Sequence, residues 1–533
     1  MPDPDVLVAG AGPVGLTMAA ELLRHGVGCR VVDRLAEPTG WVKAVGVQPR
    51  TLEMWDDWGI AREAIDDGRW MRGQIVYVDG EEAQRIDLVV PDGTFGFLAL
   101  PQDRVERLLL RRLERLGGRV ERPRELRSFE QDADGVTAVL DDDRVRTGYL
   151  VGCDGAHSAV RRGLGLSFEG DAFPEEYMLG DVEIEWAQPE GYGLRFLAKA
   201  PDGSQDILVA IPLPGHRRYR ISMLAAPELR SDTIAEHGIA TETAGPSLEQ
   251  LQAVVDRLVP GRPAVGNLRW SSVFRISHRI VDRYAVGRAF VCGDAAHIHP
   301  PTGAQGANTG MQDAYNLAWK LALAIRGLAA PGLLDSYDAE RRPVGEEVVG
   351  RTVRQAREQS MTDAAGGLRA ALMREGQLLV GYPDSPLVDG AAGAAGSEPA
   401  PGERAPDVDG LEREGVGFPV RLHELLRGPA HVALIHADTP LDEAAALEVE
   451  RVARALADRC AGALRSYVIV RGDGPAATPV GVPVIRDRGG AFAVAYGLGA
   501  PATCVIRPDG YIASLEPSLD AGGPGGVLAR TFA

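Results

Sequence analysis

The first chemically informative feature is a glycine pattern near the start of the chain. Three glycines stand in the spacing Gly-x-Gly-x-x-Gly directly after the first apolar run: Gly10, Gly12 and Gly15. Glycines here allow a tight turn, a close approach to a pyrophosphate and close packing of a following helix, whose N-terminus favours the phosphate charge. Asp33 ends the next apolar run, where it can accept hydrogen bonds from a ribose. The pattern predicts dinucleotide binding but does not separate NAD from FAD.

Two later apolar runs also deliver an aspartate to a turn. Asp154 and Gly155 follow the run 148–151, and this pattern alone favours a strand end with a capping aspartate. Asp294 follows the run 289–292, where a carboxylate can hold the hydroxyl groups of a ribityl chain. A second anchor for the dinucleotide is therefore expected far along the chain.

The elements around these motifs follow from the spacing of apolar residues. Runs at 5–9 and 29–33 enclose a helical pattern and predict a β-α-β unit. A further helix is predicted over 103–116, with Asp103 and Glu106 in a capping pattern. Both elements belong to a nucleotide-binding domain.

The remaining sequence predicts an interrupted domain order. Short alternating runs from 173 to 277 indicate an antiparallel sheet, and helical spacing resumes at 311–325. The expected nucleotide-binding domain is divided in the sequence: residues 1–172 form its first part, with about 70–100 contributing to the substrate side, and residues 278–395 form its second part, with helices. The inserted sheet is expected over 173–277, and a third domain over 400–533.

Composition excludes several other classes of protein. The chain has 533 residues and a net charge of −18, which repels nucleic acid and anionic membrane surfaces. Its five cysteines are scattered without a CxxC pair, which argues against a disulfide framework and a zinc site and favours a reducing cytoplasm. The first strand follows Met1 too closely for a signal peptide, and no apolar run is long enough to span a membrane. We therefore expect a cytoplasmic protein without a metal site.

The three motifs, in this order and spacing, resemble the fingerprints of the single-component flavoprotein aromatic hydroxylases, the family of p-hydroxybenzoate hydroxylase and phenol hydroxylase. The likeness covers roughly the first 350 residues. It implies an α/β fold with an FAD-binding Rossmann-like domain of the glutathione-reductase type and an inserted antiparallel-sheet substrate domain. The segment 507–512 resembles the C-terminal thioredoxin-like domain of phenol-hydroxylase-type members. Without a CxxC pair, packing or oligomerisation is its expected role.

The resemblance assigns cofactor-binding residues along the whole FAD molecule. For the adenosine diphosphate part it implies Gly10, Gly12, Pro13, Gly15, Asp33 and Arg34. Asp154 and Gly155 match a motif associated with the FAD pyrophosphate and NADPH, and Asp294 matches one that holds the ribityl chain. Around the isoalloxazine ring it implies Pro301, Gly303, Gly306, Ala307 and Asn308, the last two through backbone groups at the pyrimidine edge. A helix from Thr309 or Met311 would direct its positive end at the reduced flavin.

Two further positions and two departures complete this comparison. Gln102 matches a family glutamine or arginine near the ribityl region, and Lys43 stands where many members have an arginine. Lysine keeps the charge but lacks the bidentate fork of arginine. The family's Gly-Gly-Gln-Gly reads Gly-Ala-Gln-Gly over 303–306, and Ala307 replaces a large apolar residue. Both changes alter the volume beside the flavin, and hence the shape of the substrate site.

The resemblance implies a reaction with two small cosubstrates. NADPH or NADH reduces FAD, O2 adds to give a C4a-hydroperoxyflavin, and one oxygen atom passes to a phenolic or polycyclic aromatic compound. The same chemistry supports Baeyer-Villiger oxidation or epoxidation of a polyketide. A protein that binds FAD for electron transfer, without activating oxygen, is the alternative from another class.

Four residues are candidates for catalysis and substrate binding. His299 and Pro301 adjoin the expected flavin face, although a loop histidine packed on backbone explains the former equally well. Arg195 and Tyr219 lie on the inserted sheet that would cover the ring, and as solvent-facing strand residues they need no function. A homodimer is compatible with the resemblance.

Overall fold

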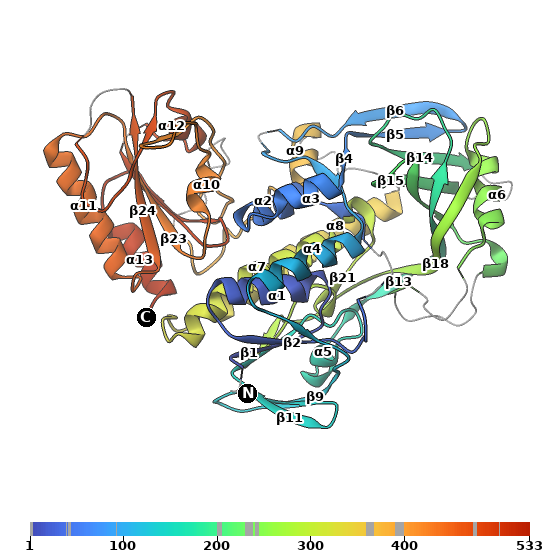
Figure 1. Cartoon of the computed structure of the whole chain (residues 1–533), viewed down its shortest axis with the longest axis horizontal. Coiled ribbons are helices and arrows are strands. Elements are labelled where there is room, and N and C mark those ends of the chain that lie inside the picture. Colours follow the sequence, from blue (N-terminus) through green and yellow to red (C-terminus); the bar gives the residue numbers. More distant parts are fainter. Residues whose placement is uncertain are drawn as a thin grey trace.

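A computed structural model of the chain describes residues 4–38, 40, 44–91, 93–199, 205–229, 238–239, 245–358, 367–389, 399–472, 477–499 and 501–533. Its larger sheets lie in three separate regions, with long helices between them (Figure 1). The C-terminal region, drawn in orange and red, lies on one side of these helices, and the green sheet lies on the other. Among the described helices, none combines the length and the apolar character needed to cross a membrane.

A six-stranded sheet forms the centre of the N-terminal region. Its strand order is β19 (Ala285–Val286), β20 (Ala289–Val291), β12 (Tyr149–Gly152), β1 (Val6–Ala9), β2 (Cys29–Val32) and β8 (Val120–Glu121). All neighbours except β19 and β20 pair in parallel. Helix α1 (Pro13–Arg24) joins β1 to β2, which confirms the predicted β-α-β unit. Parallel pairing brings the ends of β1, β12 and β20, and the motifs that follow them, to one edge of the sheet.

Three helices pack together beside this sheet: α1, α4 (Gln102–Arg115) and α7 (Gly306–Ile325). The predicted capping pair of α4 does not form, because Glu106 instead accepts a hydrogen bond from the Gln102 side chain at 2.8 Å. Helix α7 begins at Gly306, ahead of the predicted Thr309 or Met311. No side chain caps that start, so the sequence carried no signal for it.

The inserted sheet has nine strands among the described residues. In spatial order it contains β17 (Gly238–Ile239), β18 (Val265–Ile280), β13 (Glu169–Ile184), β16 (Arg218–Leu224), β15 (Gln205–Pro212), β14 (Tyr192–Lys199), β5 (Gly73–Val78) and β6 (Glu81–Asp87), with β21 (His297–Ile298) beside β18. β14 and β5 pair in parallel, and the other neighbours are antiparallel. Residues 73–87 therefore extend a sheet whose other strands come much later in the sequence.

Side chains alternate between the two faces of this sheet. On β14, Leu194 and Phe196 are buried in a core that also contains Leu251 and Val255 of α6 (Leu248–Leu258). Gly193 and Arg195 point to the other face, which borders a cavity.

The C-terminal region contains a mixed six-stranded sheet. Its order is β22 (Glu412–Arg413), β25 (Val484–Asp487), β24 (Leu464–Arg471), β23 (His431–Ala437), β26 (Ala502–Ile506) and β27 (Ile512–Glu516). Helices α11 (Glu443–Asp458) and α13 (Gly522–Thr531) pack against it. Cys460 and Cys504 are buried in different apolar clusters, so they form no dithiol centre.

The remaining elements connect these sheets. Short strands form two small sheets, β3 (Gly46–Val47) with β7 (Phe97–Ala99) and β4 (Arg69–Met71), and β9 (Leu126–Gln131) with β10 (Val136–Leu140) and β11 (Asp143–Thr147). The other α-helices are α2 (Pro49–Asp57), α3 (Ala61–Asp67), α5 (Ala159–Gly163), α8 (Asp335–Glu358), α9 (Gly367–Glu375), α10 (Leu422–Leu426) and α12 (Ala491–Ala495).

Candidate active site

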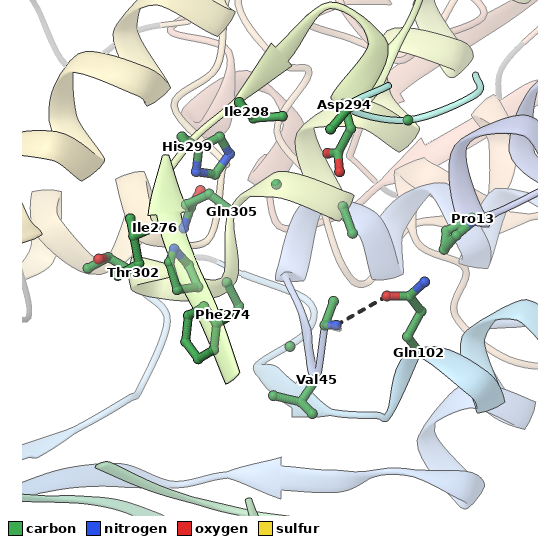
Figure 2. A pocket seen from close by; sticks show the side chains of 18 of the residues that line it. Pro13, Val45, Gln102, Phe274, Ile276, Asp294, Ile298, His299, Thr302 and Gln305 are labelled. Atoms are coloured by element: carbon green, nitrogen blue, oxygen red, sulfur yellow. Dashed lines mark hydrogen bonds between the residues drawn. The ribbon is translucent and has the colours of Figure 1, made fainter. Parts of the chain in front are cut away.

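A cavity of about 1300 Å³ lies between the motif-bearing edge of the six-stranded sheet and the open face of the nine-stranded sheet. Figure 2 shows Pro13, Gln102 and Asp294 from the first side, and Phe274 and Ile276 of β18 from the second. One cavity thus joins the predicted dinucleotide motifs to an apolar wall.

The glycine turn after β1 leaves room for a ligand at one position only. A β-carbon at Gly15 would lie 2.0 Å from the carbonyl oxygen of Gly10, and one at Gly10, whose φ is +98°, would lie 2.3 Å from the carbonyl oxygen of Cys153. A β-carbon at Gly12 would meet no described atom within 4 Å. Gly10 and Gly15 therefore allow close packing, whereas Gly12 leaves open space beside the start of α1, where a phosphate is favoured.

Asp33 is held by three neighbours at the end of β2. Its carboxylate accepts hydrogen bonds from the backbone N–H groups of Ala11 at 2.8 Å and Leu35 at 2.9 Å. It also forms an ion pair with Arg122 at 3.0 Å. A carboxylate has about four acceptor sites, so one is left for a ribose hydroxyl group. Arg34, next to it, is exposed and lines the cavity.

Asp154 is partly used by the protein. Its Oδ2 accepts hydrogen bonds from the backbone N–H groups of Ala159 at 2.7 Å and Val160 at 3.3 Å, at the start of α5. This is the capping arrangement that the local pattern favoured. Its Oδ1 is buried and has no hydrogen-bond partner in the described chain, and burial raises the pKa of the carboxyl group. Asp154 and Gly155 both line the cavity.

Asp294 points into the cavity from the turn after β20 (Figure 2). Its side chain is exposed, and no hydrogen bond engages it within the described residues. The neighbouring Gly293 is fixed, because its N–H group donates to Asp313 Oδ2 of α7 at 3.0 Å. A fixed turn with a free carboxylate is suited to holding a polyhydroxyl chain.

Gln102 lies at the start of α4 and lines the cavity. Its Oε1 accepts a hydrogen bond from the Ala44 N–H group at 3.1 Å, drawn as a dashed line in Figure 2. Its Nε2 donates to Glu106, whose pKa is raised by burial. Lys43 lies outside the described residues.

The loop 301–305 and the start of α7 form another side of the cavity. Pro301, Gly303, Gly306 and Ala307 line it. The Asn308 side chain does not, because Oδ1 accepts from Gln48 N and Thr51 Oγ1, while Nδ2 donates to the carbonyl groups of Gly46 and Ala304. Any contact of Asn308 with a flavin must therefore use its backbone. The first N–H groups of α7 lack intrahelical partners, so this end attracts negative charge.

Alanine at position 304, where the family has glycine, adopts an unfavourable backbone conformation. Its φ is +54°, a left-handed conformation that favours glycine. A β-carbon added to Gly46 would lie 2.5 Å from the Cβ atom of Ala304. The extra methyl group therefore packs toward the β3 segment.

His299 lies in the cavity wall beside Ile298 (Figure 2). Its Nδ1 lies 2.9 Å from the carbonyl oxygen of Pro300, to which it donates, and Nε2 is buried without a partner in the described chain. Burial lowers the pKa of His299 to about 4. The imidazole is therefore neutral at pH 7, and its Nε2 offers an acceptor.

The two predicted substrate residues lie on opposite faces of the nine-stranded sheet. Arg195 lines the cavity. Tyr219 is buried in the opposite core, with its ring 4.8 Å from that of Trp186, so its position does not support the predicted substrate role. Because successive strand residues alternate, the next residue, Arg220, lines the cavity instead.

Sequence reasoning missed several cavity residues. Arg122 follows β8 and reaches Asp33 only because β8 pairs with β2. Glu375, at the end of α9, borders the 301–305 loop and accepts a hydrogen bond from Gln305 at 3.0 Å. No local pattern marks either residue. Glu106 was detectable, since it lies one helical turn after Gln102.

Known proteins match this arrangement of motifs and sheets. A family model described as an FAD binding domain matches residues 3–352. The 6-methylpretetramide 4-monooxygenase of Streptomyces rimosus is 34% identical over 542 residues, which cover 96% of this chain and 90% of that protein. The chain belongs to the FAD-dependent aromatic hydroxylases. The enzyme is also 30% identical to the pentachlorophenol 4-monooxygenase of Sphingobium chlorophenolicum, over 98% of this chain and 95% of that protein.

Solved structures extend the likeness to the whole enzyme. The OxyS anhydrotetracycline hydroxylase from Streptomyces rimosus matches with a TM-score of 0.72 and 29% identity, covering 99% of each chain. An aklavinone-11 hydroxylase in complex with FAD and aklavinone matches with a TM-score of 0.77 and 26% identity, covering 99% of this chain and 98% of that one. The likeness includes the C-terminal region.

Three independent observations indicate that the cavity of the enzyme can hold FAD. Gly12 leaves space at the start of α1, the Oδ1 atom of Asp154 is buried without a partner in the described chain, and the carboxylate of Asp294 is exposed toward the cavity. The enzyme is an FAD-dependent monooxygenase.

Proposed function

We propose that the enzyme hydroxylates a phenolic or polycyclic aromatic compound, using O2 and NADPH or NADH. The observation that carries this proposal is the shared cavity, in which dinucleotide motifs face an apolar sheet wall. The names of the relatives support it, since they include monooxygenases of a chlorinated phenol and of a pretetramide.

We assign FAD to the near side of this cavity. Gly10, Gly12, Pro13, Gly15, Asp33, Arg34 and Lys43 would hold its adenosine diphosphate part, with Asp154 and Gly155 beside the pyrophosphate. Asp294 and Gln102 would hold the ribityl chain, and Pro301, Gly303, Gly306, Ala307 and backbone groups of Asn308 would border the ring. When bound, FAD supplies hydride transfer and oxygen activation.

The chain's own residues position the substrate and limit water. The wall opposite the motifs carries apolar side chains from three strands, Ile207, Leu179 and Phe274 among them. Such a wall suits the flat face of an aromatic ring and excludes water from the reacting atoms. The helix α7 would stabilise negative charge on the reduced ring through its N-terminal N–H groups. Pro301 would border the reacting face, and the Nε2 atom of His299 would accept a hydrogen bond there.

The proposal extends to features outside the cavity. We propose the domain division 1–172, 173–277, 278–395 and 400–533, with residues 70–100 on the substrate side, which the strand order of the nine-stranded sheet supports. We also propose a cytoplasmic location, supported by five cysteines that are all free thiols. A homodimer remains a prediction.

The experiment that tests this function follows oxygen into the product. The purified holoenzyme should show a flavin absorption spectrum and oxidise NADPH faster with an aromatic substrate present. Under 18O2, the product mass should rise by one labelled oxygen atom without a change in ring connectivity. Asp294→Ala should purify with little FAD, because each lost hydrogen bond to a charged group costs about 1.5–3 kcal/mol.

Other results would redirect the assignment. Oxygen inserted between two ring carbons would indicate Baeyer-Villiger chemistry, and an epoxide would indicate epoxidation. NADPH oxidation that ignores every aromatic compound and yields no oxygenated product would contradict the proposal. Full FAD occupancy in Asp294→Ala would remove that residue from the cofactor site.

A further inference from the structure

One arginine in the cavity wall has no counter-ion among the residues that the structure describes. Arg195 lies on β14 with a relative exposure of 9%, so most of its side chain is shielded from bulk water. It makes no ion pair and no hydrogen bond within the described chain, and its Nε atom is buried without a partner. Burying an unpaired charge is costly, because the interior does not replace the lost hydration.

The immediate neighbours of Arg195 cannot supply a negative charge. In the sheet register it is flanked by Val76 of β5 and Val209 of β15. Burial lowers the pKa of Arg195, and the phenol group of Tyr177 opposes this shift. Arginine stays protonated in proteins, so the cation persists in an apolar part of the wall.

Two other arginines of the same sheet line the cavity, and each has a carboxylate partner. Arg220 contacts Asp181 with two hydrogen bonds, at 2.7 and 3.0 Å. Arg275 contacts Glu176 at 2.8 Å. Among the described residues, the other two arginines of this sheet that line the cavity are thus neutralised, whereas Arg195 is not.

We propose that Arg195 recognises an ionised oxygen acid on the aromatic substrate, a phenolate, enolate or carboxylate. Such a group would supply the missing charge and accept the fork of guanidinium donors. The neighbouring Val209, which lines the same cavity, would contact the ring that carries it. This inference rests on the proposed function and adds a substrate class to it: compounds with an acidic oxygen are preferred over their neutral analogues.

Two matched pairs of probes test this preference in the FAD-loaded enzyme. 2-Naphthoate and 2-naphthamide differ in a carboxylate, and 2-hydroxy-1,4-naphthoquinone and its methyl ether differ in an enolate. Binding is followed by the change in the flavin absorption spectrum. The wild type should bind at least one anionic probe about tenfold or more tightly than its neutral partner, as expected for a charge-assisted hydrogen bond.

Three variants separate charge from general damage. Arg195→Met should abolish the preference while binding the neutral probes within about twofold of the wild type, and Arg195→Lys should retain part of it. Arg217→Gln, at an exposed arginine just before β16, should behave as the wild type. A preference for the carboxylate pair alone would identify a carboxylate anchor, and one for the enolate pair alone an enolate or phenolate anchor.

A second measurement does not depend on the choice of probe. Because an unpaired buried charge destabilises the fold, ligand-free Arg195→Met should melt at a higher temperature than the wild type. Equal binding of both members of each pair, or a preference that survives in Arg195→Met, would overturn the inference. A thermal midpoint of Arg195→Met no higher than that of the wild type would also overturn it. The same holds if the sole effect of Arg195→Met is a tenfold rise in KM for NADPH.

The same samples distinguish the proposed function from the inference about Arg195. An enzyme that shows the anion preference but forms no oxygenated product would contradict the proposed function alone. An enzyme that forms such a product without any dependence on Arg195 would contradict only the present inference.

Discussion

Gly12 and Gly15 lie in the same turn, but only Gly15 is packed against protein backbone. We expect Gly15→Ala to destabilise the fold, because its methyl group would overlap the Gly10 carbonyl oxygen. Gly12→Ala should fold with the thermal stability of the ligand-free wild type and yet bind FAD weakly, since its methyl group enters the space assigned to the pyrophosphate.

Thermal melting of the FAD-free proteins, together with FAD titration, separates these two outcomes. The variants are controls for each other, since both add a single methyl group to the turn. Wild-type FAD affinity in Gly12→Ala would show that no phosphate lies beside this glycine.

His299 predicts how the stability of the enzyme depends on pH. Burial holds its folded pKa at about 4, below the value near 6.5 of an exposed histidine. Between these values the unfolded chain binds more protons, so the free energy of unfolding falls as the pH is lowered from about 6.5 to 4. The loss from this group should reach about 2.5 kcal/mol near pH 4.5.

The variant His299→Asn isolates this contribution. Asparagine can keep the hydrogen bond to the Pro300 carbonyl group but does not titrate. Urea unfolding at several pH values should therefore show a smaller acid loss in the variant than in the wild type. Parallel curves for the two proteins would mean that His299 is not buried in neutral form.

At the scale of elements, α7 fixes the turn that carries Asp294. Asp313 of α7 contacts three groups: the Gly293 N–H group at 3.0 Å, His297 Nε2 at 2.9 Å and Arg341 Nε of α8 at 2.7 Å. The arginine keeps the pKa of Asp313 low despite burial. The helix that points at the flavin site thus also holds the turn that carries Asp294.

Asp313→Asn should therefore disturb both stability and cofactor binding. The change leaves the fully buried Arg341 without a negative partner, at a cost of roughly 3–5 kcal/mol. We expect a lower thermal midpoint and weaker FAD retention. Glu346→Gln, at an exposed position of α8, is the control and should change the free energy of unfolding by less than about 0.5 kcal/mol. Unchanged FAD retention in Asp313→Asn would contradict the anchoring role.

At the scale of the whole molecule, buried charges join the C-terminal region to the FAD-binding helices. Arg507, after β26, forms two hydrogen bonds with Glu340 of α8, at 2.6 and 2.9 Å. Lys320 of α7 contacts the same carboxylate at 2.7 Å, and burial lowers the pKa of this lysine to about 8. These contacts support a packing role for the C-terminal region.

Removal of Arg507 should weaken the attachment of the two regions. Arg507→Met leaves Glu340 with one cation only, and we expect a loss of roughly 3–5 kcal/mol in stability, seen as a lower thermal midpoint or as two separate transitions. Arg530→Met, at an exposed arginine of α13, provides the matched control. A variant that melts as a single transition at the wild-type temperature would show that these charges do not hold the regions together.

The sequence by itself determined the local parts of this enzyme. A glycine turn between a strand and a helix, and an aspartate at a strand end, are features of a few consecutive residues, and their physical requirements are visible in the residue types. Gly10, Asp154 and Asp294 could therefore be assigned to turns at strand ends from residue types and spacing alone. Apolar periodicity likewise predicted the β-α-β unit and the inserted sheet.

Only the tertiary structure decided which distant groups meet. Arg122 reaches Asp33 through strand pairing, Asp313 reaches Gly293 through helix packing, and α7 starts at Gly306 without a capping residue. Strand alternation placed Arg195 in the cavity and Tyr219 in the core, but no pattern showed that Arg195 lacks a counter-ion within the described part of the chain. Residue spacing fixes the face on which a side chain lies, whereas its partners depend on contacts between segments far apart in the chain.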